Sequence, residues 1–222
     1  NYRALANPPT ASAKPGQKLR RSAHRKTDLK PSDVPLNSGE GLRAAYYVED
    51  DPASYSSLKQ HISQIDLLFP EWLHVVNPDG SLTGYTVDNR PYNVVDRDGV
   101  HAVDRENKVA GTIAKNHVNT EIFPLVNNYD PVKGIFLPSV GDFLSSEQAR
   151  ANFIQEVDRF LAANPNYHGL SVDLEEIPSD AQSGFNALIA ALYSDFHARG
   201  LRLYVNTPVG DDDFNLKYLA DH

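Results

Sequence analysis

Runs of apolar residues of strand length alternate with stretches of helical period along most of this 222-residue chain. This alternation limits the fold more than any other feature, because a repeated strand–helix–strand order indicates parallel strands joined by crossover helices. We therefore predict an α/β protein with five βα units. The five apolar runs are residues 42–48, 65–76, 121–126, 169–177 and 201–209.

Two architectures use such units: a doubly wound open sheet and a (β/α)8 barrel of the TIM type. Residues 41–222 hold five units of about 36 residues each, and eight such units would need about 290 residues, a usual size for these barrels. We expect the barrel, with only about the first five βα units present in this chain. An open-sheet nucleotide binder would need a glycine-rich phosphate loop after its first strand, and the sequence has none there.

A stretch at about residues 77–103 interrupts the alternation after the second predicted strand. Two tight-turn dipeptides, Asp79-Gly80 and Asp98-Gly99, lie in it, and short β-favouring segments flank them. Turn signals between short strands are typical of hairpins. We therefore predict a small antiparallel insertion at this point.

Signals for helix ends support the same division of the chain. Pro52 follows an acidic residue and predicts the start of the first helix. Ser145 stands three residues before Gln148, which is a capping-box pattern, and it predicts the start of a helix there. Gly200 follows an apolar stripe of helical period and predicts the end of that helix.

Residues 1–40 differ from the rest of the chain in charge and composition. They hold eight Lys and Arg against three Asp and Glu, together with five of the 15 prolines. The other residues hold 13 basic and 26 acidic side chains, and the whole chain has a net charge of −8. We predict a basic, proline-rich linker or leader before an acidic folded body at residues 41–222. An acidic body disfavours nucleic acid as a partner.

The chain lacks cysteine and lacks any apolar run of about 18 residues. The absence of cysteine excludes disulfides, thiolate metal sites and a cysteine nucleophile. The absence of a long apolar run predicts no membrane span within this chain, although a membrane tether upstream of it stays compatible with the sequence. The histidines show no metal-ligand spacing, and we expect neither a metal nor a cofactor.

The fourth apolar run carries carboxylates where a buried strand normally has none. Ser171, Asp173 and Glu175 lie two residues apart and therefore share one face of the predicted strand, while the opposite face is apolar. Burying two carboxyl groups without partners is costly. They are expected where that face lines a polar cavity at the carboxyl end of the strand, which is where barrel enzymes place their sites.

Two neighbouring carboxyl groups push their proton affinities apart, so that one stays protonated while the other ionises. We assign the proton-donor role to Glu175, which is nearer the mouth, and the role of orienting and stabilising positive charge to Asp173. This division of labour is what cleavage of a glycosidic bond requires. A metal-dependent hydrolase with Asp173 and Glu175 as Mg²⁺ ligands is an alternative, which loss of activity on chelation would reveal.

The segment that contains these residues resembles the fourth-strand signature of glycoside hydrolase family 18, D-G-x-D-x-D-x-E. Gly169, Asp173 and Glu175 match the signature, whereas His168 and Ser171 stand where it has its first and middle aspartates. The resemblance is specific only around this strand. More loosely, the body resembles the chitinase-like domain of modular bacterial envelope proteins that also carry polysaccharide deacetylase and glycosyltransferase modules.

The resemblance implies a hydrolase of β-linked N-acetylglucosamine polymers such as chitin, peptidoglycan or an exopolysaccharide, acting outside the cytoplasm. It implies a substrate-assisted, retaining mechanism. Glu175 would protonate the glycosidic oxygen, and the substrate's own N-acetyl oxygen would attack the anomeric carbon. Asp173 would orient the acetamide group and stabilise the resulting cation.

Further polar and aromatic residues near predicted strand ends are candidates for binding the sugar. A tryptophan can stack on a sugar ring, asparagines can bond to its hydroxyls, and a serine on the Asp173 face can bond to that carboxylate. The candidates are Ser171, Trp72, Asn127, Asn128, Tyr129 and Asn206.

A non-catalytic glycan-binding barrel is the main alternative to an enzyme. The departures at His168 and Ser171 favour it. The retention of both Asp173 and Glu175 favours the enzyme, because a binding module has less need of this pair.

Overall fold

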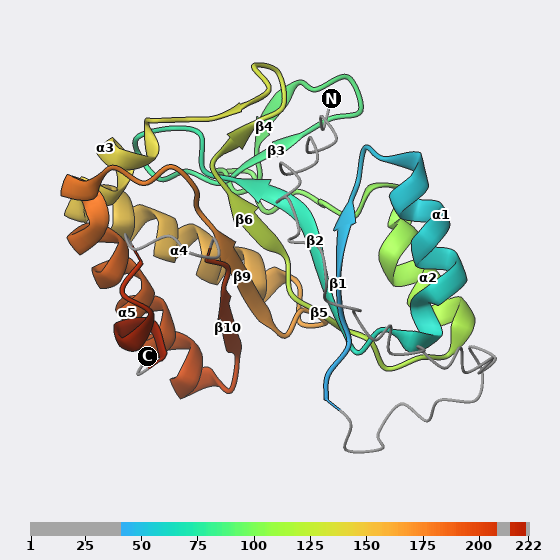
Figure 1. Cartoon of the computed structure of the whole chain (residues 1–222). Helices are drawn as coiled ribbons and strands as arrows, with labels where there is room; N and C mark the ends of the chain where they lie inside the picture. The colour runs from blue at the N-terminus through green and yellow to red at the C-terminus, as the bar shows by residue number, and fades with distance from the viewer. Residues whose placement is uncertain (1–40, 208–213, 221–222) are drawn as a thin grey trace, which may run out of the picture. The chain divides into compact units, whose positions relative to one another are not determined.

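Five parallel strand positions follow one another across a single sheet, in the order of the chain (Figure 1). The computed structural model describes residues 41–207 and 214–220, so the predicted linker at residues 1–40 lies outside the described residues. The positions are β1 (Ala44–Val48), β2 (Leu67–His74), β5 (Glu121–Ile122) with β6 (Leu125–Asn127), β9 (Gly169–Asp173) and β10 (Arg202–Val205).

The order of these strands distinguishes the two architectures that the sequence left open. Each position pairs in parallel with the next one along the chain, from β1 to β10. A doubly wound sheet would reverse its direction of growth at a switch point, and these five positions contain no reversal. The sheet therefore matches part of a TIM-type barrel. Among the described residues it does not close, because β1 and β10 each have a neighbouring strand on one side only.

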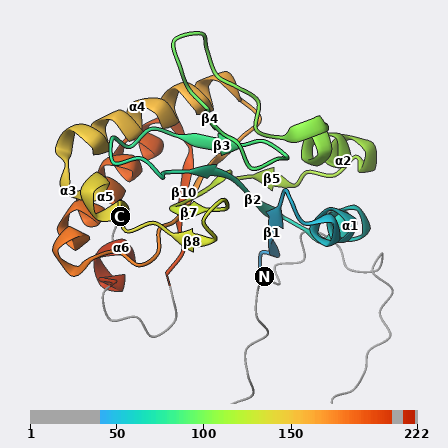
Figure 2. The ribbon, with the colours of Figure 1, turned by 90° about the horizontal axis from the view of Figure 1, so that it is seen from above.

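Helices connect the strands as the alternation predicts. Figure 2 shows α1 and α2 together near β1 and β2, and α3, α4 and α5 together toward β10. Short 3-10 turns lie at Ile62–Gln64, Arg105–Asn107 and Ser179–Ala181. The helices are α1 (Pro52–His61), α2 (Lys108–Asn116), α3 (Val140–Ser145), α4 (Glu147–Ala163), α5 (Gln182–Arg199) and α6 (Leu216–Ala220). Within the described residues, no helix is long and apolar enough to cross a membrane.

Two of the three predicted helix ends are confirmed, and the third is wrong by one residue. Helix α1 starts at Pro52, and α5 ends at Gly200, whose φ of 71° suits a residue without Cβ. Helix α4 is capped by Ser146 rather than Ser145, since the Ser146 hydroxyl accepts the Ala149 N–H at 3.2 Å. Ser145 is instead the last residue of α3, which ends directly before α4.

The stretch predicted as an antiparallel insertion forms a hairpin beyond the end of β2. Strands β3 (Thr83–Tyr85) and β4 (Pro91–Asn93) pair antiparallel, and Thr83 of β3 pairs with His74 of β2. A second short hairpin, β7 (Tyr129–Asp130) and β8 (Ile135–Phe136), follows β6 and was not predicted from the sequence. Both hairpins follow the carboxyl ends of the parallel strands.

Apolar side chains pack on both faces of the parallel strands. On the outer face, strand residues such as Val126 and Leu170 join helix residues such as Phe153 and Leu188 in one buried cluster. On the inner face lies a smaller cluster, which consists of Leu67, Phe69, Phe123 and Leu125, with Tyr204 packed against it. The floor of the barrel interior is therefore apolar, and the polar residues of the strands lie above it.

An irregularity in β2 decides which of its side chains face the interior. The pairing of β2 with β6 shifts register between Glu71 and Leu73. After the shift His74 pairs with Asn127, while Leu73 belongs to the outer cluster. Bulges of this kind re-aim side chains and are common next to active sites.

Candidate active site

Strand β9, next to the edge strand β10, leads into the carboxyl pair that the sequence singled out. Leu170 and Val172 are fully buried in the outer cluster, so Ser171 and Asp173 lie on the inner face. The strand ends at Asp173, and Leu174 returns to the outer cluster. Glu175 therefore follows on the inner side, just beyond the carboxyl end of the strand.

Asn128 holds the backbone of Glu175 from both sides. Its Oδ1 accepts the Glu175 N–H at 2.9 Å, and its Nδ2 donates to the Glu175 carbonyl, also at 2.9 Å. The same Nδ2 donates to the Leu137 carbonyl at 3.2 Å, and the residue is fully buried. Asn128 is thus a positioning residue for Glu175, and the expectation that its amide binds sugar is corrected.

This two-sided contact predicts that Asn128→Ala impairs the site more than it impairs substrate capture. The change leaves the N–H and carbonyl of a half-buried segment without partners, at a cost of about 1–3 kcal/mol for each such group. For any reaction that uses the Glu175 carboxyl group, we expect kcat to fall at least about tenfold with KM little changed, because Glu175 loses its fixed position. Steady-state kinetics with a denaturation curve for the variant would check this; an unchanged kcat in a folded variant would contradict it.

Burial raises the pKa of both carboxyl groups of the pair. Burial first, then the negative charges of Asp173 and Glu176, raise the pKa of Glu175. Burial also raises the pKa of Asp173, but a hydrogen bond from Asn206 opposes this effect. Both carboxyl groups are thus shifted toward the protonated form, and the bond from Asn206 favours the ionised form of Asp173.

Two residues reach Asp173 from the two edges of the sheet. Asn206 directly follows β10, where its N–H donates to the Val172 carbonyl at 2.8 Å, and its side chain bonds to Asp173. Tyr46 lies on β1, and its pKa is raised by burial and by the Asp173 charge and lowered by a hydrogen bond with Asn206. The sheet is thus curved enough for β1 and β10 to converge on Asp173. Sequence reasoning proposed Asn206 and missed Tyr46.

Asn127 links two further interior groups that the sequence did not single out. Its Nδ2 donates to Glu71 Oε1 at 2.8 Å, while its Oδ1 lies 2.8 Å from His74 Nδ1 and accepts the Tyr129 N–H at 3.1 Å. Burial lowers the pKa of His74 to about 4, so its ring is neutral near pH 7 and donates from Nδ1 to Asn127. Asn127 lies in register with Asp173, but its amide serves this network.

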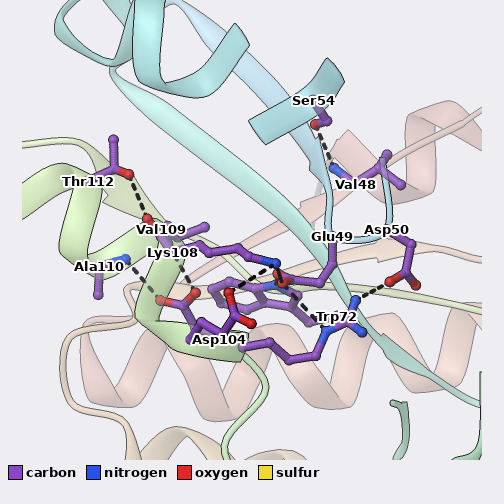
Figure 3. A network of polar contacts seen from close by, with 12 residues as sticks. Val48, Glu49, Asp50, Ser54, Trp72, Asp104, Lys108, Val109, Ala110 and Thr112 are labelled. Atoms are coloured by element: carbon purple, nitrogen blue, oxygen red, sulfur yellow. Dashed lines mark hydrogen bonds and ion pairs between the residues drawn. The ribbon is translucent and has the colours of Figure 1, made fainter. Parts of the chain in front are cut away.

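Trp72 lies on the opposite face of the sheet from the carboxyl pair, which corrects its assignment as a sugar platform. It is 4% exposed, and its ring packs against Tyr167 with centroids 5.7 Å apart. Its Nε1 donates to Glu49 Oε2 at 3.0 Å, and Lys108 Nζ donates to Glu49 Oε1 at 3.2 Å (Figure 3). The indole therefore joins β2 to the end of β1 and to α2 within the outer core.

The remaining predicted residues occupy distinct places. The Tyr129 ring packs against Phe136 within the β7–β8 hairpin, with centroids 5.3 Å apart. Ser171 is fully buried on the inner face, and its hydroxyl has no hydrogen-bond partner among the described residues. His168 is exposed next to Phe123, at the amino end of β9 and thus far along the strand from Glu175.

A pocket of about 470 Å³ opens between the two hairpins and is lined by residues of both. Tyr85, Tyr92, Asn93 and Lys133 contribute to its lining. The ring of Tyr85 also meets the edge of the His74 ring, with centroids 4.9 Å apart. Tyr85 therefore links the lining of the pocket to His74, which bonds to Asn127.

No group of three or more His, Asp or Glu side chains within residues 41–207 and 214–220 is arranged to hold a metal ion. Asp173 and Glu175 thus have no third ligand of these types in that part of the chain.

Comparison with known proteins finds similarity in structure only. No protein family profile and no curated protein matches the chain. The class V chitinase from Pseudomonas fluorescens Pf-5 aligns with a TM-score of 0.59 at 19% identity, over 81% of this chain and 51% of that one. The chitinase from Chromobacterium violaceum ATCC 12472 aligns with a TM-score of 0.60 at 18% identity, over 81% and 52%.

The spore cortex-lytic enzyme SleL from Bacillus megaterium QM B1551 aligns with a TM-score of 0.60 at 14% identity, over 82% of this chain and 40% of that one. The chain thus spans about half the length, or less, of these structures. At such identities the similarity shows the fold alone, and the chain has a chitinase-like α/β fold.

Proposed function

We propose that the protein is a glycoside hydrolase of family 18 type that cleaves β-linked N-acetylglucosamine polymers by a substrate-assisted, retaining mechanism. The observation that carries the proposal is the pair at the end of β9. Glu175 is fixed by Asn128, and its pKa is raised by burial and by the charges of Asp173 and Glu176. The chitinase-like fold supports the same activity.

Each member of the pair has a chemical role in this proposal. Glu175 donates its proton to the glycosidic oxygen as the bond to the leaving sugar breaks. The acetamide oxygen of the substrate attacks the anomeric carbon, which gives a cyclic oxazolinium ion. Asp173, ionised and bonded to Asn206, orients the acetamide N–H and stabilises the positive charge. Glu175 then removes a proton from the water that opens the ring.

The location outside the cytoplasm and the linked deacetylase and glycosyltransferase modules belong to the same proposal. They rest on the polymer substrate and on the resemblance around β9. The pocket between the two hairpins is where we place a further part of the glycan, because its tyrosines and asparagine offer ring faces and amides to a sugar.

The acetyl group provides the sharpest test of this proposal. We expect the protein to shorten N-acetylglucosamine oligomers and to leave glucosamine oligomers of the same length intact, because only the former carry the internal nucleophile. Mass spectrometry of the products would show this difference, and a chelator in a parallel sample should not change the rate. Equal cleavage of both oligomers would contradict the substrate-assisted mechanism, and cleavage of neither would contradict the hydrolase.

A glycan-binding module without activity is the second candidate, and the Ser171 environment favours it. Its hydroxyl lies where the signature has a carboxyl group and has no partner among the described residues. Binding of the same oligomers without any cleavage would support this candidate.

A further inference from the structure

We propose that Glu71 acts through Asp173 as a positioning residue, supplying from β2 the carboxylate that β9 lacks at Ser171. This inference rests on the proposed function, since it assigns Glu71 a part in stabilising the cation. Glu71 lies on β2, whereas the signature lies on β9. The evidence for its role is the strand register, a hydrogen bond and the charges around it.

Strand register places Glu71 at the height of Ser171 in the barrel interior. Glu71 pairs with Leu125 across β2 and β6, and Leu125 pairs with Ser171 across β6 and β9. We call this row the Ser171 layer. One step toward the mouth, Asn127 pairs with Asp173. The Ser171 layer therefore lies directly beneath Asp173 and contains a carboxyl group, although β9 itself contributes none.

A hydrogen bond ties the Glu71 side chain to the neighbour of Asp173. Asn127 Nδ2 donates to Glu71 Oε1 at 2.8 Å, which directs the carboxyl group toward the mouth. Asn127 is itself held in place, because its Oδ1 bonds to His74 and to the Tyr129 N–H. Glu71 therefore has a fixed orientation two strands away from Asp173 and one step below it.

The charged and titratable groups around Glu71 come from three strands. Asp173 of β9 and Asp50, which follows β1, both act on it electrostatically, and His74 of β2 shares its partner Asn127. Tyr46 of β1 lies within the field of the same Asp173. Asp50 is ion-paired with Arg105, and His74 is neutral near pH 7, so Asp173 is the unpaired charge among them.

Repulsion between Glu71 and Asp173 is the physical basis of the role. Burial and the Asp173 charge raise the pKa of Glu71, against the hydrogen bond from Asn127. Above that pKa the charges of two half-buried carboxylates repel each other, and a cation forming near Asp173 relieves the repulsion. Ionised Glu71 therefore lowers the barrier to cleavage, whereas protonated Glu71 does not.

The sign of the pH dependence follows from this argument. Below the Glu71 pKa, residue 71 is neutral both in the wild type and in Glu71→Gln, so the two should have equal kcat. Above it only the wild type gains the charge, and we expect the ratio of the wild-type kcat to the variant kcat to rise to about tenfold. The glutamine in Glu71→Gln still has a side-chain oxygen that can accept the hydrogen bond from Asn127. A purely structural effect of this change would therefore give a kcat ratio that does not change with pH.

Two variants and one spectroscopic measurement complete the test. Ser171→Asp in the Glu71→Gln background returns a carboxylate to the same layer, and we expect it to restore most of the lost kcat at high pH. Glu156→Gln is the control, since Glu156 is half-buried against the Leu82 N–H and has no contact with Asp173. Its kcat ratio should not vary with pH. Carbon-13 NMR of the Glu71 carboxyl should show a lower pKa in Asp173→Asn than in the wild type.

The outcomes separate this inference from the function on which it rests. A pH-independent ratio for Glu71→Gln, or a Glu71 titration that Asp173→Asn leaves unchanged, would overturn the inference while cleavage by the wild type upholds the hydrolase. A shifted Glu71 titration in a protein that cleaves no oligomer would overturn the hydrolase and, with it, any role of Glu71 in cleavage.

Discussion

Replacing Glu175 with glutamine should lower kcat for N-acetylglucosamine oligomers by about 10²–10⁴-fold, the usual contribution of a general acid. Glutamine keeps the size of the side chain. Asn128 bonds to the backbone of Glu175 and not to its side chain, so the position of the residue should be retained. What is lost is the proton that the leaving oxygen needs. Initial rates of product formation, followed by chromatography, would measure the effect.

Glu176→Gln is a matched control for this change. Glu176 is the next residue in the chain, is exposed and has a φ of 54°, so its backbone is more strained than that of Glu175. Its charge is the smallest of the three causes that raise the pKa of Glu175. We expect less than about a threefold change in kcat. Equal losses in the two variants would show that the loop, rather than the Glu175 carboxyl, limits the reaction.

Substituting Gly169 with alanine should destabilise the protein by about 3 kcal/mol or more. Gly169 starts β9 with a φ of 147°, and a Cβ there would stand 1.8 Å from the carbonyl oxygen of Arg202 in β10. The neighbouring strand would have to move, since the contact is with its backbone. Because β10 leads to Asn206, the change should also disturb Asp173. Urea unfolding of the variant and the wild type would measure the loss of free energy.

Gly99→Ala separates the steric clash from the cost of the backbone conformation. Gly99 has a φ of 144°, close to that of Gly169, but a Cβ added there meets nothing within 4 Å. It should show only the conformational penalty, which is about 1–3 kcal/mol. If both alanine variants lost the same free energy, contact with β10 would not be the cause.

The sequence predicted those features of the fold that depend on near neighbours in the chain. The apolar alternation, the start of α1 after its N-cap Asp51 and the C-cap Gly200 of α5 each involve a few consecutive residues. The pair Asp173 and Glu175 was proposed on the same basis, and the alternation of inner and outer side chains continues past the end of β9, where Leu174 is again in the outer cluster. The capping serine was misplaced by one residue because two serines are adjacent and α3 takes up the first of them.

Features that depend on distant residues were missed or misassigned. Asn128 bonds to a residue 47 positions away, and nothing in its local sequence indicates that partner. Trp72 was misassigned because β2 is apolar on both faces, so the sequence does not show which residues face inward. Tyr46 and Glu71 reach Asp173 only once the sheet curves and β2 shifts its register.

The Ser171 layer bears on how relatives of this protein can be detected. A linear signature reads one strand and records a serine as a loss, although a carboxyl group stands at the same height on β2. Two proteins can therefore share the same ring of acidic groups in space and still disagree at a signature position. A comparison of the inward-facing residues that lie in register on neighbouring strands would place such proteins in one group. A signature read along one strand would place them in different groups.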